Sequence, residues 1–186
     1  SQTPSEVESL FKDLLITVTN FFRDPESFDI LKESIIPDLI AKVSDGSSIR
    51  CWVTGCATGE EAYSIAIIFA EVLSQHNRYN NVQIFATDID NDAIETARMG
   101  IYPDSIVANV SPERIQRFFN KDSNMYQIKK QIREMVVFAS QNLIKDPPFS
   151  RLHLISCRNL LIYMDQVLQK QILPLFHYSL NQDGIL

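Results

Sequence analysis

Hydrophobic spacing predicts two helices in the first 43 residues. Residues 6–19 fit an amphipathic helix, because their apolar positions recur every three or four residues. A second helix should begin at Asp24-Pro25-Glu26, since proline suits a first helical turn, and should run to about Val43. Pro37 is expected to kink or break this second helix. The polar stretch 44–48 then predicts a loop.

Beyond this loop, short apolar runs alternate with helical patterns. Strands are predicted at 49–54, 82–87, 135–139 and 152–157. Helices are predicted at 60–75, 92–99 and 166–180, the last interrupted near Pro174. This order predicts an α/β fold with a doubly wound, mostly parallel sheet and right-handed crossovers. Because Gly184-Ile185-Leu186 reads as the start of another strand, the sheet is expected to be cut off before its last strands.

The stretch 100–134 breaks the alternation. It contains a helix opened by Ser111-Pro112-Glu113 and a β-like run, Met125 to Lys129. A crossover this long, with elements of its own, usually serves a function. From Glu113 to Arg133 there are six basic residues against two acidic ones. Such a run can be a solvated face or a docking patch for an acidic protein partner, and the charges alone leave both open.

Composition narrows the class of protein. The net charge of −6 disfavours a general nucleic-acid binder, which needs a basic surface. Three cysteines without a C-x-x-C pair, and three scattered histidines, argue against a disulfide framework and a metal site. No apolar run approaches the roughly 20 residues of a membrane span, and the N-terminus lacks a basic leader region. We therefore expect a cytoplasmic protein with no membrane insertion.

The strongest local motif is Val53-Thr54-Gly55-Cys56-Ala57-Thr58-Gly59-Glu60-Glu61, between the first predicted strand and its helix. In a doubly wound sheet, ligands bind at such strand ends. The G-x-x-x-G spacing is neither the dinucleotide pattern nor a phosphate-binding loop. Its two acids would repel phosphate and favour a cationic ligand. A plain tight turn would give the same glycine pair.

Asp88 closes the second predicted strand, in Ala86-Thr87-Asp88-Ile89-Asp90. A carboxylate there can accept the hydrogen bonds of a ribose diol, as the acidic residue of nucleotide-binding folds does. A helix cap is the alternative, although Asp90 or Asn91 also stands before the next helix.

With these motifs in view, nearly the whole chain resembles the CheR-type chemoreceptor glutamate methyltransferases. Four blocks in order carry the resemblance: Thr17-Val18-Thr19-Asn20-Phe21-Phe22-Arg23, Trp52 to Ser64, Phe85 to Asp90, and Cys157-Arg158-Asn159-Leu160-Leu161-Ile162-Tyr163. The resemblance implies a class I, Rossmann-like methyltransferase fold with S-adenosyl-L-methionine as cofactor and S-adenosyl-L-homocysteine as product. Asp146-Pro147-Pro148-Phe149-Ser150 is similar to versions in hybrid proteins that add esterase and sensor-kinase modules.

The resemblance also implies roles for single residues. Thr17, Thr19 and Arg23 would reach the cofactor from the helical lead-in, with Arg23 facing its carboxylate. Either Glu60 or Glu61 would face its ammonium group. The remaining cofactor contacts would come from Gly55, Gly59, Asp88 at the ribose, Asn142 and Leu143 at the adenine, and Arg158 and Asn159 near the methionine portion.

Catalysis and docking are implied by the same resemblance. Tyr163, with Arg158, would lie close to the transferred methyl group, although a core tyrosine would give the same pattern. The family often has asparagine where this chain has Thr17. The partners would be cytoplasmic helices of methyl-accepting chemoreceptors. The docking residues would be Arg114, Arg117, Lys129 and Lys130.

Three segments are expected from this reading. Residues 1–43 would be a helical lead-in that ends an N-terminal helical domain, and residues 44–186 the methyltransferase domain. Residues 100–137 would be an inserted small β-subdomain that grips the receptor.

Two other functions fit parts of the sequence. Asp146-Pro147-Pro148-Phe149 resembles the D-P-P-[YF] signature of adenine-N6 methyltransferases, but it stands before a predicted strand instead of ending one. Two prolines in a stiff turn explain it equally well. A non-catalytic module that binds cofactor and receptor without methyl transfer is the second alternative.

Overall fold

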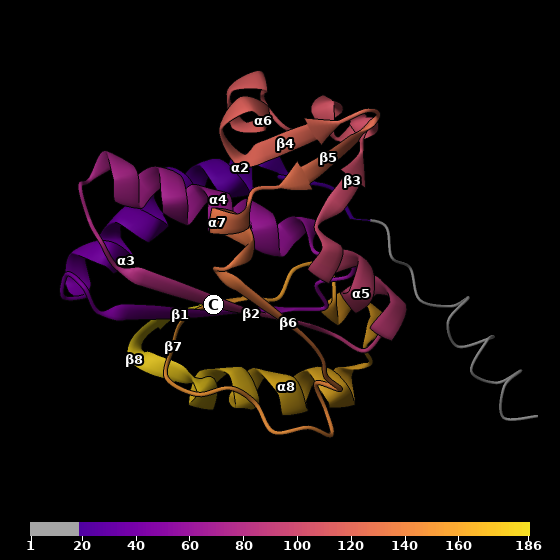
Figure 1. Cartoon of the computed structure of the whole chain (residues 1–186). Helices are drawn as coiled ribbons and strands as arrows, with labels where there is room; N and C mark the ends of the chain where they lie inside the picture. The colour runs from indigo at the N-terminus through magenta and orange to yellow at the C-terminus, as the bar shows by residue number, and fades with distance from the viewer. Residues whose placement is uncertain (1–18) are drawn as a thin grey trace, which may run out of the picture.

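A parallel five-stranded sheet forms the centre of the computed structural model, which describes residues 19–186 (Figure 1). The strand order is β6-β2-β1-β7-β8, and every pair is parallel. The strands are β1 (Ser48–Thr54), β2 (Asn81–Asp88), β6 (Val136–Ser140), β7 (Leu152–Ser156) and β8 (Leu180–Ile185). The predicted doubly wound, mostly parallel fold is confirmed, while the helix predicted at 6–19 lies outside the described residues up to position 18.

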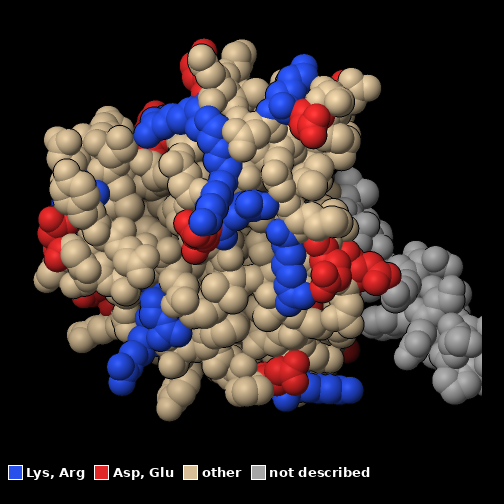
Figure 2. All heavy atoms as spheres, in the orientation of Figure 1, with Lys and Arg blue, Asp and Glu red and all other residues tan. Residues whose placement is uncertain are grey.

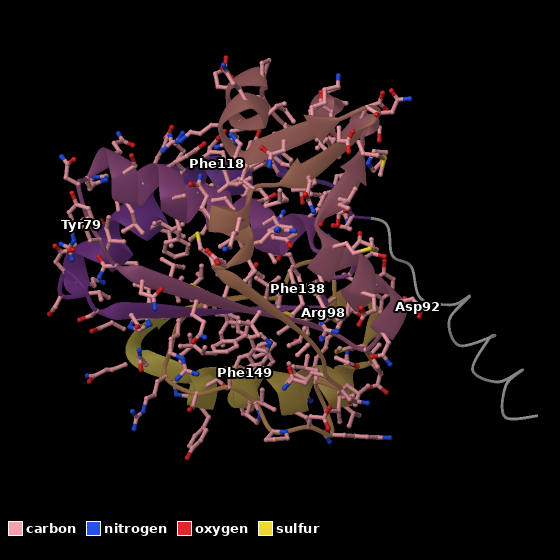
Figure 3. The ribbon with its side chains drawn as sticks, in the orientation of Figure 1. Tyr79, Asp92, Arg98, Phe118, Phe138 and Phe149 are labelled. Carbon is pink, nitrogen blue, oxygen red and sulfur yellow. The ribbon has the colours of Figure 1, made fainter. Side chains whose placement is uncertain are left out.

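Helices cover both faces of this sheet. The helices α3 (Ile36–Lys42) and α4 (Glu60–Gln75) lie on one face, and α8 (Gln166–Ser179) lies on the other (Figure 1). The side chains of β1 alternate between two cores: Val53 belongs to the α4 side, and Trp52 to the α8 side. Figure 3 shows Phe138 on β6 and Phe149 beside α8, one in each core.

Both prolines that were expected to interrupt helices are accommodated. The first run consists of α2 (Pro25–Ile30), a π-helical turn η1 (Leu31–Ile35) and α3, so the chain stays helical through Pro37. The Ile36 N–H donates to the carbonyl of Leu31, and this wider turn ahead of the proline replaces a break. α8 likewise continues through Pro174 without an interruption. β8 begins at Leu180, earlier than the strand expected from Gly184.

The long crossover builds a second, antiparallel sheet of order β3-β5-β4. Its strands are β3 (Ile101–Pro103), β4 (Phe119–Asp122) and β5 (Met125–Ile128), with the short helices η2 (Asp104–Ala108), α6 (Pro112–Phe118) and α7 (Lys130–Arg133). It follows α5 (Asn91–Met99), which covers the sheet beside β6. Figure 1 shows the small sheet stacked beyond α2 and α4, away from the large sheet. The Ser111 hydroxyl accepts the Arg114 N–H at 3.3 Å, so the predicted start of α6 is confirmed.

Among residues 19–186, no helix combines the length and the apolar character needed to cross a membrane.

Candidate functional site

The loop after β1 strongly favours glycine at two positions. Gly55 and Gly59 have φ angles of 63° and 94°, in the left-handed region that glycine tolerates. A Cβ on Gly59 would lie 2.9 Å from the Cβ of Ala97 and 3.1 Å from the Phe138 ring. A Cβ on Gly55 would lie 3.1 Å from the side chain of Leu160. The loop therefore packs tightly against α5, β6 and the segment after β7.

Asp88 fixes this loop to the end of β2. Its carboxylate accepts the N–H of Ala57 at 2.8 Å and the N–H of Asp90 at 3.0 Å. The cap of α5 is Asp90, whose side chain accepts the N–H groups of Asp92 and Ala93. Asp90 therefore caps α5, so the alternative role of Asp88 as the cap of this helix does not apply. Because a carboxylate has about four lone-pair sites, Asp88 retains acceptors for a ligand.

The two acids of the loop point in different directions. The Glu60 carboxylate accepts the Thr58 hydroxyl at 2.7 Å and turns back along the loop. The Glu61 carboxylate accepts the Ser156 hydroxyl at 2.8 Å and lies 3.5 Å from Nη1 of Arg158, at the end of β7. Burial raises the pKa of both carboxyls, and for Glu61 the Ser156 hydroxyl and the Arg158 charge act in the opposite direction. This geometry favours Glu61 as the acid that points along the strand ends, towards β7.

Arg158 joins β7 to the turn that contains Arg23. Its Nη2 donates to the carbonyl of Arg23 and to Oδ2 of Asp24, both at 2.7 Å. Its guanidinium carbon lies 5.0 Å from the centre of the Phe28 ring. Nη1 is buried without a hydrogen-bond partner in the described structure, so it can still donate to a ligand. Thr19 lies half-buried just before this turn, and Thr17 is outside the described residues.

The segment after β6 lies beside Asp88. The Gln141 N–H donates to the carbonyl of Asp88 at 2.9 Å, which places Asn142 next to the ribose candidate. The side-chain oxygen of Asn142 accepts the N–H groups of Ile144 and Lys145. Only its amide nitrogen can therefore serve in the adenine contact implied by the resemblance. Leu143 is partly buried against the core on the α8 side.

The segment after β7 carries the last candidates. Asn159 is exposed and adopts a positive φ of 54°. Tyr163 ends the short turn η3 (Leu161–Tyr163) and is 60% exposed, so the alternative of a core tyrosine is excluded. Leu160, between them, packs against Gly55. These positions lie at the same edge of the sheet as Asp88, because the carboxyl ends of parallel strands share one edge.

Three polar residues of this network were missed by the sequence analysis: Ser156, Asp24 and Thr58. Ser156 could have been found, since it lies next to the end of the predicted strand 152–157, at the ligand-binding edge. Asp24 was interpreted only as the start of a helix. No pattern in the sequence indicates that Thr58 bonds to Glu60.

Only part of the expected docking patch is available to a partner. The Arg114 guanidinium donates twice to Glu71, at 2.9 and 3.0 Å, and Nζ of Lys129 donates to the carbonyls of Gln116 and Arg117 at 2.9 Å. These internal contacts occupy Arg114 and Nζ of Lys129, and Nζ of Lys130 lies 3.5 Å from the Glu134 carboxylate, so the docking role of these residues stays a prediction. Arg117 and Lys130 are exposed. Figure 2 shows basic side chains over the small sheet and α7, with acidic ones between them.

Phe149 of the D-P-P-F sequence belongs to the core on the α8 side. Its ring stacks on Phe85 with centroids 4.3 Å apart and meets Trp52 edge-on at 5.3 Å. The ring is therefore occupied by core packing, which argues against a base-stacking role. Within residues 19–186, no group of three or more His, Cys, Asp and Glu side chains is placed to hold a metal ion.

Comparison with protein families matches residues 17–186 to the CheR methyltransferase, SAM binding domain. An uncharacterized 104.1 kDa protein in the hypE 3′ region of Rhodobacter capsulatus is 42% identical over 182 residues, which is 98% of this chain and 19% of that protein. The chemotaxis protein methyltransferase of Borreliella burgdorferi is 37% identical over 90% of this chain and 61% of its own length. That of Salmonella typhimurium is 33% identical, over 100% of this chain and 64% of its own length.

This chain thus spans less than two thirds of each of these three relatives. Among solved structures, the crystal structure of DszA carbon methyltransferase matches with a TM-score of 0.53 at 18% identity. The match covers 87% of this chain and 34% of that one, and it supports the fold alone.

Proposed function

Because this chain belongs to the CheR methyltransferase family, as a SAM-binding domain, we propose that it methylates glutamate side chains of chemoreceptors. The observation that carries the proposal is the placement of Glu61, in the first turn of α4, and Asp88, at the end of β2, on either side of the glycine loop. Two acids at this edge suit a ligand with a positive sulfur and an ammonium group, and they oppose a phosphate ligand.

Residues of this chain are proposed for each part of S-adenosylmethionine. Glu61 would hold its ammonium group, while Arg23 and the buried Nη1 of Arg158 would hold its carboxylate. Asp88 would hold the ribose. The other proposed contacts are Thr17, Thr19, Gly55, Gly59, Asn142, Leu143 and Asn159.

The proposed reaction requires little proton transfer by the protein. When bound, S-adenosylmethionine supplies a methyl group on a positively charged sulfur. A glutamate substrate has a pKa of about 4.3, so it is ionised at neutral pH and needs no general base. The protein's task is then to align the attacking oxygen, which in favourable cases supplies roughly 7–11 kcal/mol. Tyr163, exposed in the segment after β7, would orient the substrate carboxylate through its hydroxyl.

Receptor docking is proposed for the small β-subdomain within residues 100–137. Its exposed basic residues, Arg117 and Lys130, would meet acidic receptor helices and speed encounter more than they deepen affinity. The match that fills only 19% of the Rhodobacter capsulatus relative supports a place beside other modules, for which the resemblance suggests esterase and kinase domains.

The decisive experiment is mass spectrometry of receptor fragments incubated with the protein and S-adenosylmethionine. We expect a mass gain of one CH₂ unit on glutamate that disappears after mild alkali treatment, because methyl esters hydrolyse in base. Cofactor binding without any mass gain would support the non-catalytic module instead. Methylation of DNA in place of receptor fragments would support the amine methyltransferase.

A further inference from the structure

The turn that carries Arg23 has an unfavourable backbone. Phe22 and Asp24, on either side of Arg23, have φ angles of 50° and 57°. Residues other than glycine rarely adopt such positive φ angles. Such a conformation persists only when the surroundings hold it in place. On the sheet side, Arg158 holds the turn in place by donating a hydrogen bond to the Arg23 carbonyl.

The other side of the turn is held by the small β-subdomain. The Phe21 ring is buried and meets Tyr102 edge-on at 4.8 Å and Phe119 at 5.5 Å. The Phe22 ring is also buried, and the Arg114 guanidinium carbon lies 4.1 Å from its centre. Since Tyr102, Phe119 and Arg114 all belong to the subdomain, the turn is packed between it and the large sheet.

Arg114 is itself held rigidly. Its Nε and Nη2 donate to the two carboxylate oxygens of Glu71 on α4, at 2.9 and 3.0 Å. Lys32 adds a second cation 3.1 Å from the same carboxylate. Although burial of Glu71 opposes it, these partners keep the pKa of that carboxyl below its ordinary value, so it is ionised at neutral pH. A planar guanidinium in a two-bond contact presents a fixed face to the Phe22 ring.

We propose that Arg114 is a positioning residue for the cofactor site: stacked on Phe22 and anchored by Glu71, it sets where the Arg23 side chain stands. Arg114 makes no cofactor contact of its own in this arrangement. The inference rests on the proposed role of Arg23, which is to hold the carboxylate of S-adenosylmethionine. It assigns to the small subdomain a part in cofactor binding besides receptor docking.

Two ligands separate this role from a general structural one. S-adenosylhomocysteine contains the amino-acid carboxylate and ammonium group, whereas 5′-methylthioadenosine keeps the adenosine and thioether and lacks both. Calorimetry with Arg114→Met should show an affinity for S-adenosylhomocysteine about 5- to 10-fold weaker, with the affinity for 5′-methylthioadenosine unchanged. Equal losses for both ligands, or no loss for either, would overturn the proposal.

Lys121→Met is the matched control. Lys121 is an exposed base in the same subdomain whose Nζ lies 5.3 Å from the Tyr126 ring centre, with no part in the turn. This variant should bind both ligands as the parent does. If Arg114→Met fails to fold, Arg114→Lys replaces it, because lysine keeps a charge for Glu71 and loses the flat stack. The same selective loss, about 3-fold, is then expected, and its absence overturns the proposal.

Arg23→Met distinguishes failure of this inference from failure of its premise. If Arg23 holds the carboxylate, Arg23→Met reduces the affinity for S-adenosylhomocysteine alone. If Arg23→Met shows this selective loss of affinity and Arg114→Met does not, the positioning role of Arg114 is wrong. The role proposed for Arg23 then stands. Should Arg23→Met show no selective loss, the role proposed for Arg23 is wrong.

Discussion

The carboxylate of Asp88, at the end of β2, accepts the backbone N–H of Ala57, in the middle of the loop that follows β1, at 2.8 Å. β1 and β2 are parallel neighbours, and their last pair in register, Thr54 with Thr87, comes directly before Asp88. One side chain therefore holds the glycine loop in shape and stands at the proposed ribose position. Substitutions of Asp88 should affect both stability and ligand affinity, in proportions that depend on the replacement.

Asp88→Ala should weaken S-adenosylhomocysteine binding by about 10-fold or more, because a charged acceptor of ligand hydrogen bonds is lost. It should also lower the free energy of unfolding by about 1–3 kcal/mol, since the Ala57 and Asp90 N–H groups lose their partner. Calorimetry and thermal unfolding measure the two effects. Asp90→Ala, which removes only the α5 cap, should cost about 1 kcal/mol and leave affinity intact. Undiminished affinity in Asp88→Ala would exclude the ribose role.

The pH dependence of cofactor binding should report on Glu61. Burial raises the pKa of this carboxyl, and a protonated carboxyl cannot attract an ammonium group. The affinity for S-adenosylhomocysteine should therefore fall as pH is lowered from 7 towards the ordinary glutamate value of about 4.3. Glu61→Gln should bind more weakly at pH 7 and show a flatter profile. Glu60→Gln should keep the parent's slope, since Glu60 turns towards Thr58. If only Glu60→Gln flattened the pH dependence of affinity, Glu60 and not Glu61 would be the acid that faces the ammonium group.

Packing at Gly59 can be tested by stability alone. Gly59→Ala should lower the free energy of unfolding by about 2–4 kcal/mol, from the left-handed backbone and from the collision with Ala97 and Phe138. Gly46→Ala is the matched control, because Gly46 also has a positive φ, 79°, but a Cβ there would meet nothing within 4 Å. It should cost only about 1–2 kcal/mol. Equal costs in chemical denaturation would show that the Gly59 loop relaxes around the added methyl group.

The large sheet was predictable because its signals are local. Apolar runs and helical periodicity give β1, α4 and β2 to within a residue or two, and the order of elements gives the parallel arrangement. The break expected at Pro37 is absent, because a π turn ahead of a proline depends on packing that periodicity does not reveal. β8 was placed too late, since its first residues, Leu180-Asn181-Gln182, carry no apolar run.

The direction of individual side chains was less predictable than their place in the chain. The spacing puts Glu60 and Glu61 at the start of one helix, but only the folded contact with Ser156 separates them. Charge counting assigned Arg114 to the surface, whereas its partner Glu71 lies 43 residues earlier and cannot be identified from a local pattern. Contacts between distant segments decide such cases.

Receptor docking should depend on Arg117 and Lys130, two of the exposed bases of the small subdomain. Reversing Arg117 and Lys130 to glutamate should slow receptor methylation several-fold at low salt, because attraction to acidic helices becomes repulsion. The rates of variant and parent should converge as salt screens these exposed charges. Cofactor affinity, measured in parallel, should stay the same. Identical rates at low salt would remove the docking role from this surface.

The hydroxyl of Tyr163 should matter for the reaction and not for cofactor binding. Tyr163 is 60% exposed at the end of η3, where a receptor glutamate could reach it and where little of the fold depends on it. Tyr163→Phe should therefore keep the parent's unfolding temperature and affinity for S-adenosylhomocysteine. Its kcat for receptor methylation should fall roughly 10- to 100-fold, because an orienting hydrogen bond at the attacking carboxylate is lost. Tyr178→Phe, altering an 85% exposed tyrosine of α8, is the control and should leave kcat as it is. An unchanged kcat in Tyr163→Phe would leave the alignment of the substrate to other residues at this edge, with Arg158 the first to test.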